Sequence, residues 1–271
     1  MKFETVRDIS LPKIGFGTWS IGGGSRADPS KDAKSLAALR SALELGYTHF
    51  DTAEMYAAGH CEELIGQALK DTRTPRERVF ITSKVSPEHL VGDQIRKSCE
   101  ASLHRLDIDY IDLYLIHWPR LGMRLEDSFN HLNQLVTAGK VRYLGVSNFN
   151  LKLLKQAQAA SESPILTNQV PYSLADRSYV KNGLLDYCQQ NDILLTAYSP
   201  LDQGGFRSNQ ILDKIAGSQG ATVEQIALTW LTSQRRVITI PMSFDPVHQR
   251  ENLSSVELSL SEEQIKQLNG L

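Results

Sequence analysis

Four residues whose side chains can transfer or position a proton lie where short apolar segments of the sequence stop. Asp51 and Tyr56 follow one such segment, and Lys84 and His117 end the next two. A further segment ends at the amide side chain of Asn148. In a parallel barrel the carboxyl ends of all strands meet at one mouth, where active sites are built. We therefore expect these side chains to lie close together.

An Asp, a Tyr, a Lys and a His together suit one kind of chemistry. A phenol with an ordinary pKa near ~10 is a poor acid at neutral pH, and a nearby ammonium favours the phenolate and lowers that pKa. An Asp paired with the Lys keeps the ammonium charged, and a neutral His can orient a carbonyl oxygen by donating a hydrogen bond. This set would protonate an alkoxide or deprotonate an alcohol, whereas a transferred hydride must come from a cofactor. Taken singly, each residue has a structural explanation, such as a helix cap for the Asp.

The order of the predicted elements explains how these strand ends would meet. Residues 2–12 predict a short hairpin, and apolar runs predict strands at 14–18, 47–50, 79–83, 110–116, 141–146, 165–170, 193–197 and 236–240. Helical periodicity predicts helices near 32–46, 61–70, 91–105, 125–138, 150–160, 177–190, 208–218, 222–233, 246–254 and 261–268. Strands that alternate with helices pair in parallel. Eight such units predict an α/β fold, a single (β/α)8 TIM barrel over residues 1–271 with an N-terminal β-hairpin. A doubly wound open sheet is the alternative.

Composition argues against several other classes of function. The chain has 41% hydrophobic and 22% charged residues, a net charge of −2 and no block of like charge, so neither a nucleic-acid nor a membrane partner is expected. The three cysteines are far apart, so no metal site or disulfide is expected. The glycine cluster at 21–25 lacks the spacing of a phosphate-binding loop. Without a signal-peptide pattern or a run of about 18 apolar residues, a cytoplasmic protein is expected.

Motifs around the four residues run from end to end of the chain. They are GFGT (15–18), GYTHFDTAEMY (46–56), ELIG (63–66), TSK (82–84), DYIDLYLIHWP (109–119), GKVRYLGVSNF (139–149), NQV (168–170) and AYSPL (197–201), with IPMS (240–243) and EN (251–252) near the end. With these motifs the chain resembles the aldo-keto reductases. The resemblance implies NAD(P)H-dependent reduction of an aldehyde or ketone to an alcohol. It also implies that Tyr56 is the general acid/base, that Lys84 and Asp51 tune it, and that His117 positions the substrate carbonyl.

The resemblance further implies where a nicotinamide cofactor would lie, extended across the barrel without a Rossmann domain. By matching position, the cofactor-binding residues are Thr18 and Trp19 beside the nicotinamide, Ser147, Asn148 and Gln169 at its carboxamide, Tyr198 stacked on its ring, Ser199 and Leu201 along the pyrophosphate, and Met242, Ser243, His248, Glu251 and Asn252 at the adenosine end. A small carbonyl substrate would lie beside Tyr56 and His117.

The substrate pocket and the cofactor preference are the points at which the chain departs from the family that it resembles. The match stops soon after the last predicted helix, so we expect an open pocket bounded by Trp19, Trp118 and Phe149, although these aromatics could equally be packing residues. A monomer is expected. Met242 stands where the family usually has a Lys, and His248 where an Arg commonly grips the 2′-phosphate of NADPH.

Losing two cations removes charge-assisted hydrogen bonds to a phosphate, so we predict a preference for NADPH over NADH that is weakened or reversed. Arg250 lies close enough in sequence to compensate. The cofactor is therefore NADPH or NADH. Two other functions stay open: a cofactor-binding regulatory subunit without significant turnover, and a lyase that uses Lys84 as a Schiff-base amine.

Overall fold

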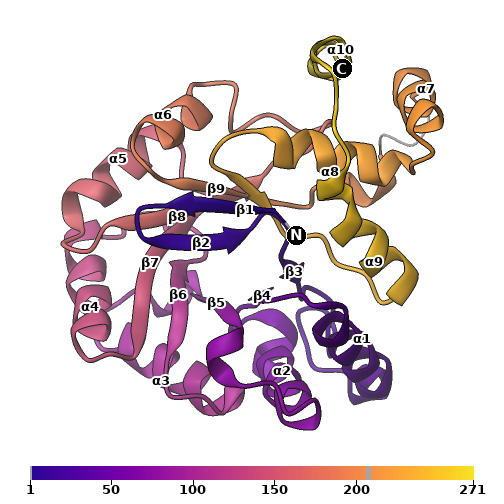
Figure 1. The fold of residues 1–271 in the computed structure, drawn as a ribbon. Coiled ribbons are helices and arrows are strands. Elements are labelled where there is room, and N and C mark those ends of the chain that lie inside the picture. Colours follow the sequence, from indigo (N-terminus) through magenta and orange to yellow (C-terminus); the bar gives the residue numbers. More distant parts are fainter. Residues whose placement is uncertain (1, 206–208) are drawn as a thin grey trace.

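A single parallel sheet forms the centre of the molecule (Figure 1). The structure is a computed structural model, and it describes residues 2–205 and 209–271. The strands of this eight-stranded sheet are β3 (Phe16–Gly17), β4 (His49–Asp51), β5 (Phe80–Val85), β6 (Ile111–Ile116), β7 (Val141–Ser147), β8 (Ile165–Pro171), β9 (Leu194–Tyr198) and β10 (Val237–Thr239). Each strand pairs in parallel with its neighbour in the chain, as expected when a helix connects consecutive strands.

The first and last strands of the sheet come together, and this contact curls the sheet into a barrel. Ile14 forms an isolated parallel bridge with Thr239. The Gly15 N–H donates to the Thr239 carbonyl at 2.8 Å, and the Thr239 N–H donates to the Lys13 carbonyl at 2.9 Å. The predicted (β/α)8 fold is confirmed.

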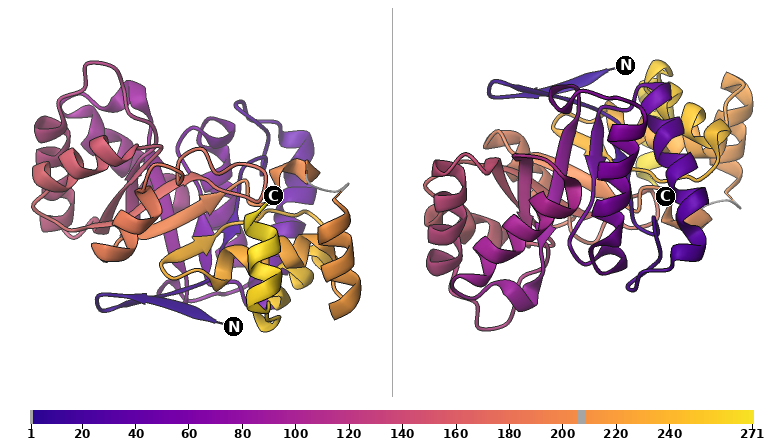
Figure 2. Two further views of the ribbon diagram at one scale, coloured as in Figure 1. Left: turned by 90° about the horizontal axis from the view of Figure 1, so that it is seen from above. Right: turned by 90° about the horizontal axis from the view of Figure 1, so that it is seen from below.

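Helices surround the sheet on its outer side (Figures 1 and 2). They are α1 (Asp32–Leu45), α2 (His60–Asp71), α3 (Gln94–Leu106), α4 (Leu125–Thr137), α5 (Leu151–Ala160), α6 (Leu184–Gln190), α7 (Gln210–Gln219), α8 (Val223–Ser233), α9 (Pro246–Ser254) and α10 (Glu262–Asn269). Local sequence sets several of their ends. Gly46 ends α1 in the left-handed conformation at φ 95°, and Thr222 begins α8 with a capping box to Gln225. Among the described residues, no helix is both long and apolar enough to cross a membrane.

The predicted hairpin is present as β1 (Phe3–Val6) and β2 (Ile9–Pro12), and it lies across one end of the barrel (Figure 2). Its apolar side chains pack against residues that fill the barrel interior; this cluster consists of Val6, Ile9, Leu11, Leu113, Leu115, Leu166, Leu194 and Ile238. Just after β2, the buried Lys13 pairs with Glu4 at 2.5 Å and donates to the carbonyl of Val237, the first residue of β10. The hairpin therefore closes the amino-terminal end of the barrel and leaves the carboxyl ends of the strands for a binding site.

Three predicted elements differ from those observed. The helix predicted at 177–190 begins only at Leu184. Gly183 takes a left-handed conformation at φ 78°, and a right-handed helix cannot continue through a residue in that conformation. The strand predicted at 14–18 is regular only over β3, and Ile14 adds a single bridge. The helix predicted at 91–105 begins at Gln94. Residue 208, where another helix was expected to begin, lies outside the described residues.

Candidate active site

A cavity of about 1040 Å³ opens at the carboxyl ends of the strands. Its volume lies at the upper end of the range for small-molecule sites. All of the predicted site residues except Lys84 and Phe149 line it: Thr18, Trp19, Asp51, Tyr56, His117, Trp118, Ser147, Asn148, Gln169, Tyr198, Ser199, Leu201, Met242, Ser243, His248, Glu251 and Asn252. The structure thus brings together, in one cavity, residues that are spread over most of the chain.

Lys84 lies beneath the cavity floor as one half of a buried ion pair. Its side chain is fully buried, and its Nζ lies 2.5 Å from the Asp51 Oδ1 at the end of the neighbouring strand β4. The ammonium also donates to the Thr52 carbonyl at 2.8 Å. On the other side, the Gln169 Nε2 donates to the Asp51 Oδ2 at 2.6 Å. A buried charge is tolerated only when it is paired and hydrogen-bonded, and here both charges are.

Tyr56 lies directly above this pair. The Lys84 Nζ is 3.3 Å from the phenol oxygen of Tyr56, the third hydrogen-bond contact of the ammonium. Burial, with a further contribution from the Asp51 charge, raises the pKa of Tyr56 well above its ordinary value. The lowered pKa predicted from the ammonium alone is therefore wrong in direction. The phenol holds its proton at neutral pH, which is the state that a proton donor requires.

The ammonium is itself affected by its surroundings. Burial lowers the pKa of Lys84, and the neighbouring Asp51 carboxylate acts in the opposite direction. The pair is therefore best described as a unit in which the carboxylate offsets the cost of burying the cation.

His117 faces Tyr56 across the site. The two rings meet edge-on, with centroids 5.7 Å apart and planes at 71°. Burial, assisted by the Lys84 charge, lowers the pKa of His117 to about 3, so the imidazole is neutral at physiological pH. Its Nδ1 is buried without a hydrogen-bond partner among the described residues. A neutral imidazole can donate one hydrogen bond to a carbonyl oxygen without adding a charge.

A hydrogen-bonded net of amides and hydroxyls forms the opposite wall. The Asn148 Nδ2 donates to the His117 carbonyl at 3.0 Å and to the Ser147 Oγ at 2.9 Å. The Ser147 hydroxyl donates to the Gln169 carbonyl at 2.9 Å, and the Tyr198 hydroxyl donates to the Asn148 Oδ1 at 2.9 Å. Amides and hydroxyls beside an aromatic ring are the donor set that suits a planar carboxamide, so these residues fit a nicotinamide. The same net links this wall to Asp51 through Gln169.

The far end of the cavity is built from the segment after β10 and from α9. The predicted residues Met242, Ser243, His248, Glu251 and Asn252 lie here. No Lys or Arg is among the described residues that line the cavity, and Arg250 is exposed outside it. Sequence reasoning missed Thr222 and Glu224, which also line the cavity at the start of α8. The spacing of Thr222 and Gln225, which form a capping box in the structure, is the signal that could have drawn attention to this helix start.

The mouth of the cavity is aromatic and apolar. Trp19 and Trp118 are 50% and 41% exposed, and Met55, which the sequence did not single out, is 38% exposed beside them. The rings of Trp19 and Tyr56 meet edge-on with centroids 5.0 Å apart. For Phe149 the sequence leaves both a pocket wall and a packing role open, and the structure gives it the packing role. It is fully buried in the hydrophobic core and does not line the cavity.

Comparisons with known proteins agree with this geometry. A sequence model described as the Aldo/keto reductase family matches residues 13–271. A methylglyoxal reductase of Escherichia coli is 37% identical, with 97% of this chain and 91% of the relative covered. An NADH-specific methylglyoxal reductase of the same organism is 31% identical, with 94% and 93% covered.

Solved structures are equally similar. A thermostable aldo-keto reductase solved with the inhibitor epalrestat superposes with a TM-score of 0.96 at 44% identity, covering 100% of this chain and 99% of the other. An aldo-keto reductase of Klebsiella pneumoniae in complex with NADPH superposes with a TM-score of 0.89 at 36% identity, covering 100% and 95%.

Proposed function

The chain belongs to the aldo/keto reductase family and is an NAD(P)H-dependent carbonyl reductase, and we propose that Tyr56 supplies the proton in this reaction. The observation that carries the proposal is the position of the phenol oxygen, 3.3 Å from an ammonium that is itself buried and paired with Asp51. Tyr56 lines the cavity, whereas Lys84 lies beneath it. Of these two side chains, only the Tyr56 phenol can reach a substrate.

Each of the four residues then has a distinct task. A bound nicotinamide supplies the hydride. Tyr56 donates its proton to the carbonyl oxygen as negative charge develops there, and the Lys84 ammonium stabilises the phenolate left behind. Asp51 keeps that ammonium charged and in place. Neutral His117 donates a hydrogen bond that orients the carbonyl oxygen toward Tyr56. In the reverse direction the same residues remove a proton from an alcohol.

The remaining lining residues suit the parts of an extended dinucleotide. Ser147, Asn148 and Gln169 would hold the carboxamide, and the Tyr198 ring would stack on the nicotinamide. Further along the cavity, Ser199 and Leu201 would follow the pyrophosphate, and the residues of α9 with Ser243 would face the adenosine. The hydrogen bonds from Gln169 to Asp51 and from Asn148 to the His117 carbonyl would couple the nicotinamide wall to the proton-transfer residues.

NADH is the cofactor that the far end of the cavity favours. Met242 and His248 lie where a 2′-phosphate would need cations, and Glu251 is close by in the same lining. A phosphate that gains no charge-assisted hydrogen bond does not recover the cost of leaving water. A relative of this chain is named for NADH specificity, which supports the same proposal.

The substrate is proposed to be a small uncharged aldehyde or ketone. Around Tyr56 the mouth presents Trp19, Met55 and Trp118, which offer apolar contact and no cation. A carboxylate there would lose hydration without gaining a partner. A relative named for methylglyoxal reduction acts on a compound of this kind.

Replacement of the phenol tests the role of Tyr56. Tyr56→Phe should lower kcat by about a hundredfold to ten-thousandfold, the range for loss of a general acid, while the cofactor Kd stays within about threefold. The measurement is steady-state kinetics with an aldehyde, combined with cofactor titration. Tyr114→Phe is the matched control, because Tyr114 is buried on β6 and its hydroxyl has no partner among the described residues. Turnover that survives in Tyr56→Phe would show that another group donates the proton.

Parallel kinetics with NADH and NADPH test the cofactor preference. We expect kcat/KM for NADH to equal or exceed that for NADPH, since each missing charge-assisted contact to the 2′-phosphate lowers kcat/KM for NADPH by about tenfold. Met242→Lys combined with His248→Arg should raise the NADPH/NADH ratio by about a hundredfold and leave kcat/KM for NADH nearly unchanged. A hundredfold preference of the wild type for NADPH would contradict the proposal.

An aldehyde that carries a carboxylate, compared with its uncharged methyl ester, tests the substrate class. Methyl 4-oxobutanoate should be reduced with a kcat/KM at least about tenfold higher than 4-oxobutanoate, because only the carboxylate pays for desolvation at an apolar mouth. Both are measured with the same cofactor at neutral pH. Equal or better turnover of the carboxylate would overturn the proposed substrate class.

A further inference from the structure

We propose that Cys61 is a positioning residue, which holds the Tyr56-bearing loop against the ends of β3 and β4 for proton transfer. The inference rests on the proposed role of Tyr56 and adds a residue that touches neither substrate nor cofactor. Cys61 is the second residue of α2 and is fully buried. It does not line the cavity among the described residues.

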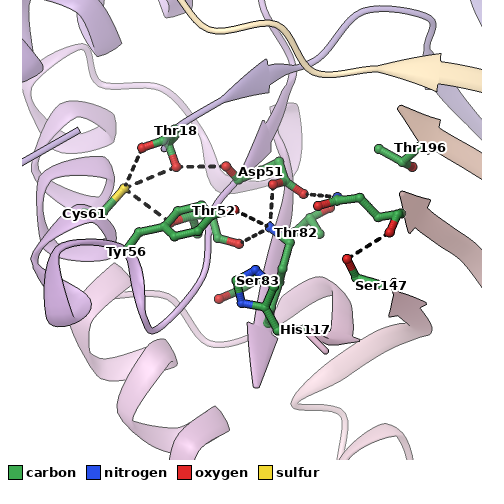
Figure 3. Close-up of polar contacts among 12 residues, drawn as sticks. Thr18, Asp51, Thr52, Tyr56, Cys61, Thr82, Ser83, His117, Ser147 and Thr196 are labelled. Atoms are coloured by element: carbon green, nitrogen blue, oxygen red, sulfur yellow. Dashed lines mark hydrogen bonds and ion pairs between the residues drawn. The ribbon is translucent and has the colours of Figure 1, made fainter. Parts of the chain in front are cut away.

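The thiol connects three segments of the chain (Figure 3). Its Sγ lies 3.2 Å from the Thr18 Oγ1 and 3.5 Å from the Thr18 carbonyl oxygen, beyond the end of β3. The Thr52 hydroxyl, just after β4, donates to the same sulfur at 3.4 Å. The Thr18 hydroxyl in turn donates to the Asp51 carbonyl at 2.8 Å. Hydrogen bonds thus run from Thr52 through the thiol and Thr18 to the backbone of Asp51.

These contacts enclose the loop that carries Tyr56. Thr52 and Cys61 flank residues 53–60, and the hydrogen bond between them closes this loop at its base. Within the loop Ala57 and Ala58 take the left-handed conformation at φ 50° and 55°, which is strained for a residue with a Cβ. Such strain persists only where the surrounding contacts over-determine the backbone. The Cys61 contacts are therefore placed where they would hold a strained loop in one shape.

The residues in contact with Cys61 are linked to the hydrogen-bond partners of Lys84. The Thr52 carbonyl accepts a hydrogen bond from the Lys84 Nζ, and Asp51 holds the ion pair. If Thr52 and the loop relax, the 3.3 Å contact between the Lys84 Nζ and the Tyr56 oxygen should lengthen. A weaker contact with the ammonium disfavours the phenolate, so proton transfer slows and the pKa of Tyr56 moves further up.

The thiol is in the correct state for this task. Burial raises the pKa of Cys61 to about 12, so the group stays protonated at physiological pH. A protonated thiol donates one hydrogen bond and accepts another, which the two threonines use. Hydrogen bonds of a thiol are weak, so the expected effect is a change of several-fold and not a complete loss.

Two variants of Cys61 test the proposal, with pH profiles of alcohol oxidation as the main readout. Cys61→Ala, which removes both hydrogen bonds, should lower kcat by about three- to tenfold and leave the KM of the cofactor unchanged. It should also move the limb on which kcat rises with pH, which reports the ionisation of Tyr56, to higher pH. Cys61→Ser, which keeps a donor and an acceptor, should recover most of the rate and the position of the limb. Cys188→Ala removes an equally buried thiol on α6 and should change neither.

The outcomes separate positioning from general stability. An unchanged kcat and pH profile in Cys61→Ala would overturn the proposal. So would a loss in Cys61→Ser as large as in Cys61→Ala, or a parallel loss in Cys188→Ala, because only a packing defect explains these. Tyr56→Phe is assayed alongside. If it is inactive while Cys61→Ala is normal, only the role of Cys61 fails, whereas activity in Tyr56→Phe would remove the proposed function itself.

Discussion

The buried ion pair between Lys84 and Asp51 is the interaction on which the rest of the site depends. An ammonium with no exposed surface is tolerable only if every one of its hydrogens finds a partner. Three atoms meet that need here, the Asp51 carboxylate, the Thr52 carbonyl and the phenol oxygen of Tyr56. The third partner is the phenol of Tyr56. The contact that completes the hydrogen bonding of the buried ammonium is therefore also the contact that positions the proton donor.

The barrel satisfies this requirement through strand register. Asp51 pairs with Thr82 across β4 and β5, and Lys84 lies two residues further along β5, so its side chain starts on the same face of the sheet and reaches the Asp51 carboxylate. On the opposite side of the barrel, Ser147 pairs with Gln169 across β7 and β8. From there the Gln169 side-chain amide donates to the second oxygen of the Asp51 carboxylate. The hairpin closes the other end, and the polar groups gather where the cavity opens. The sheet thus fixes Asp51, Lys84 and Gln169 relative to one another, while Tyr56 is carried by the loop that follows β4.

Much of this arrangement could be predicted from the sequence, since alternating strands and helices and reactive residues at strand ends are local patterns. What could not be predicted depends on tertiary burial. The pKa of Tyr56 shifts upward because the phenol is buried, with a further contribution from the Asp51 charge, and no local pattern reports burial. Phe149 has the composition of a pocket wall but packs in the core. Thr222 and Glu224 line the cavity because the start of α8 lies beside it. That position depends on the tertiary fold, which no local sequence pattern reports.

If Asp51 and Lys84 act as one unit on Tyr56, a double-mutant cycle on single-turnover rates will show the coupling between them. The rates are measured for wild type, Asp51→Asn, Lys84→Met and the double variant, with saturating cofactor and aldehyde. Residues that act through one another give strongly non-additive losses. We expect the double variant to be no slower than Lys84→Met alone, because without the ammonium the carboxylate has nothing left to hold. Losses that multiply in the double variant would mean that the two residues act independently, and would contradict this expectation.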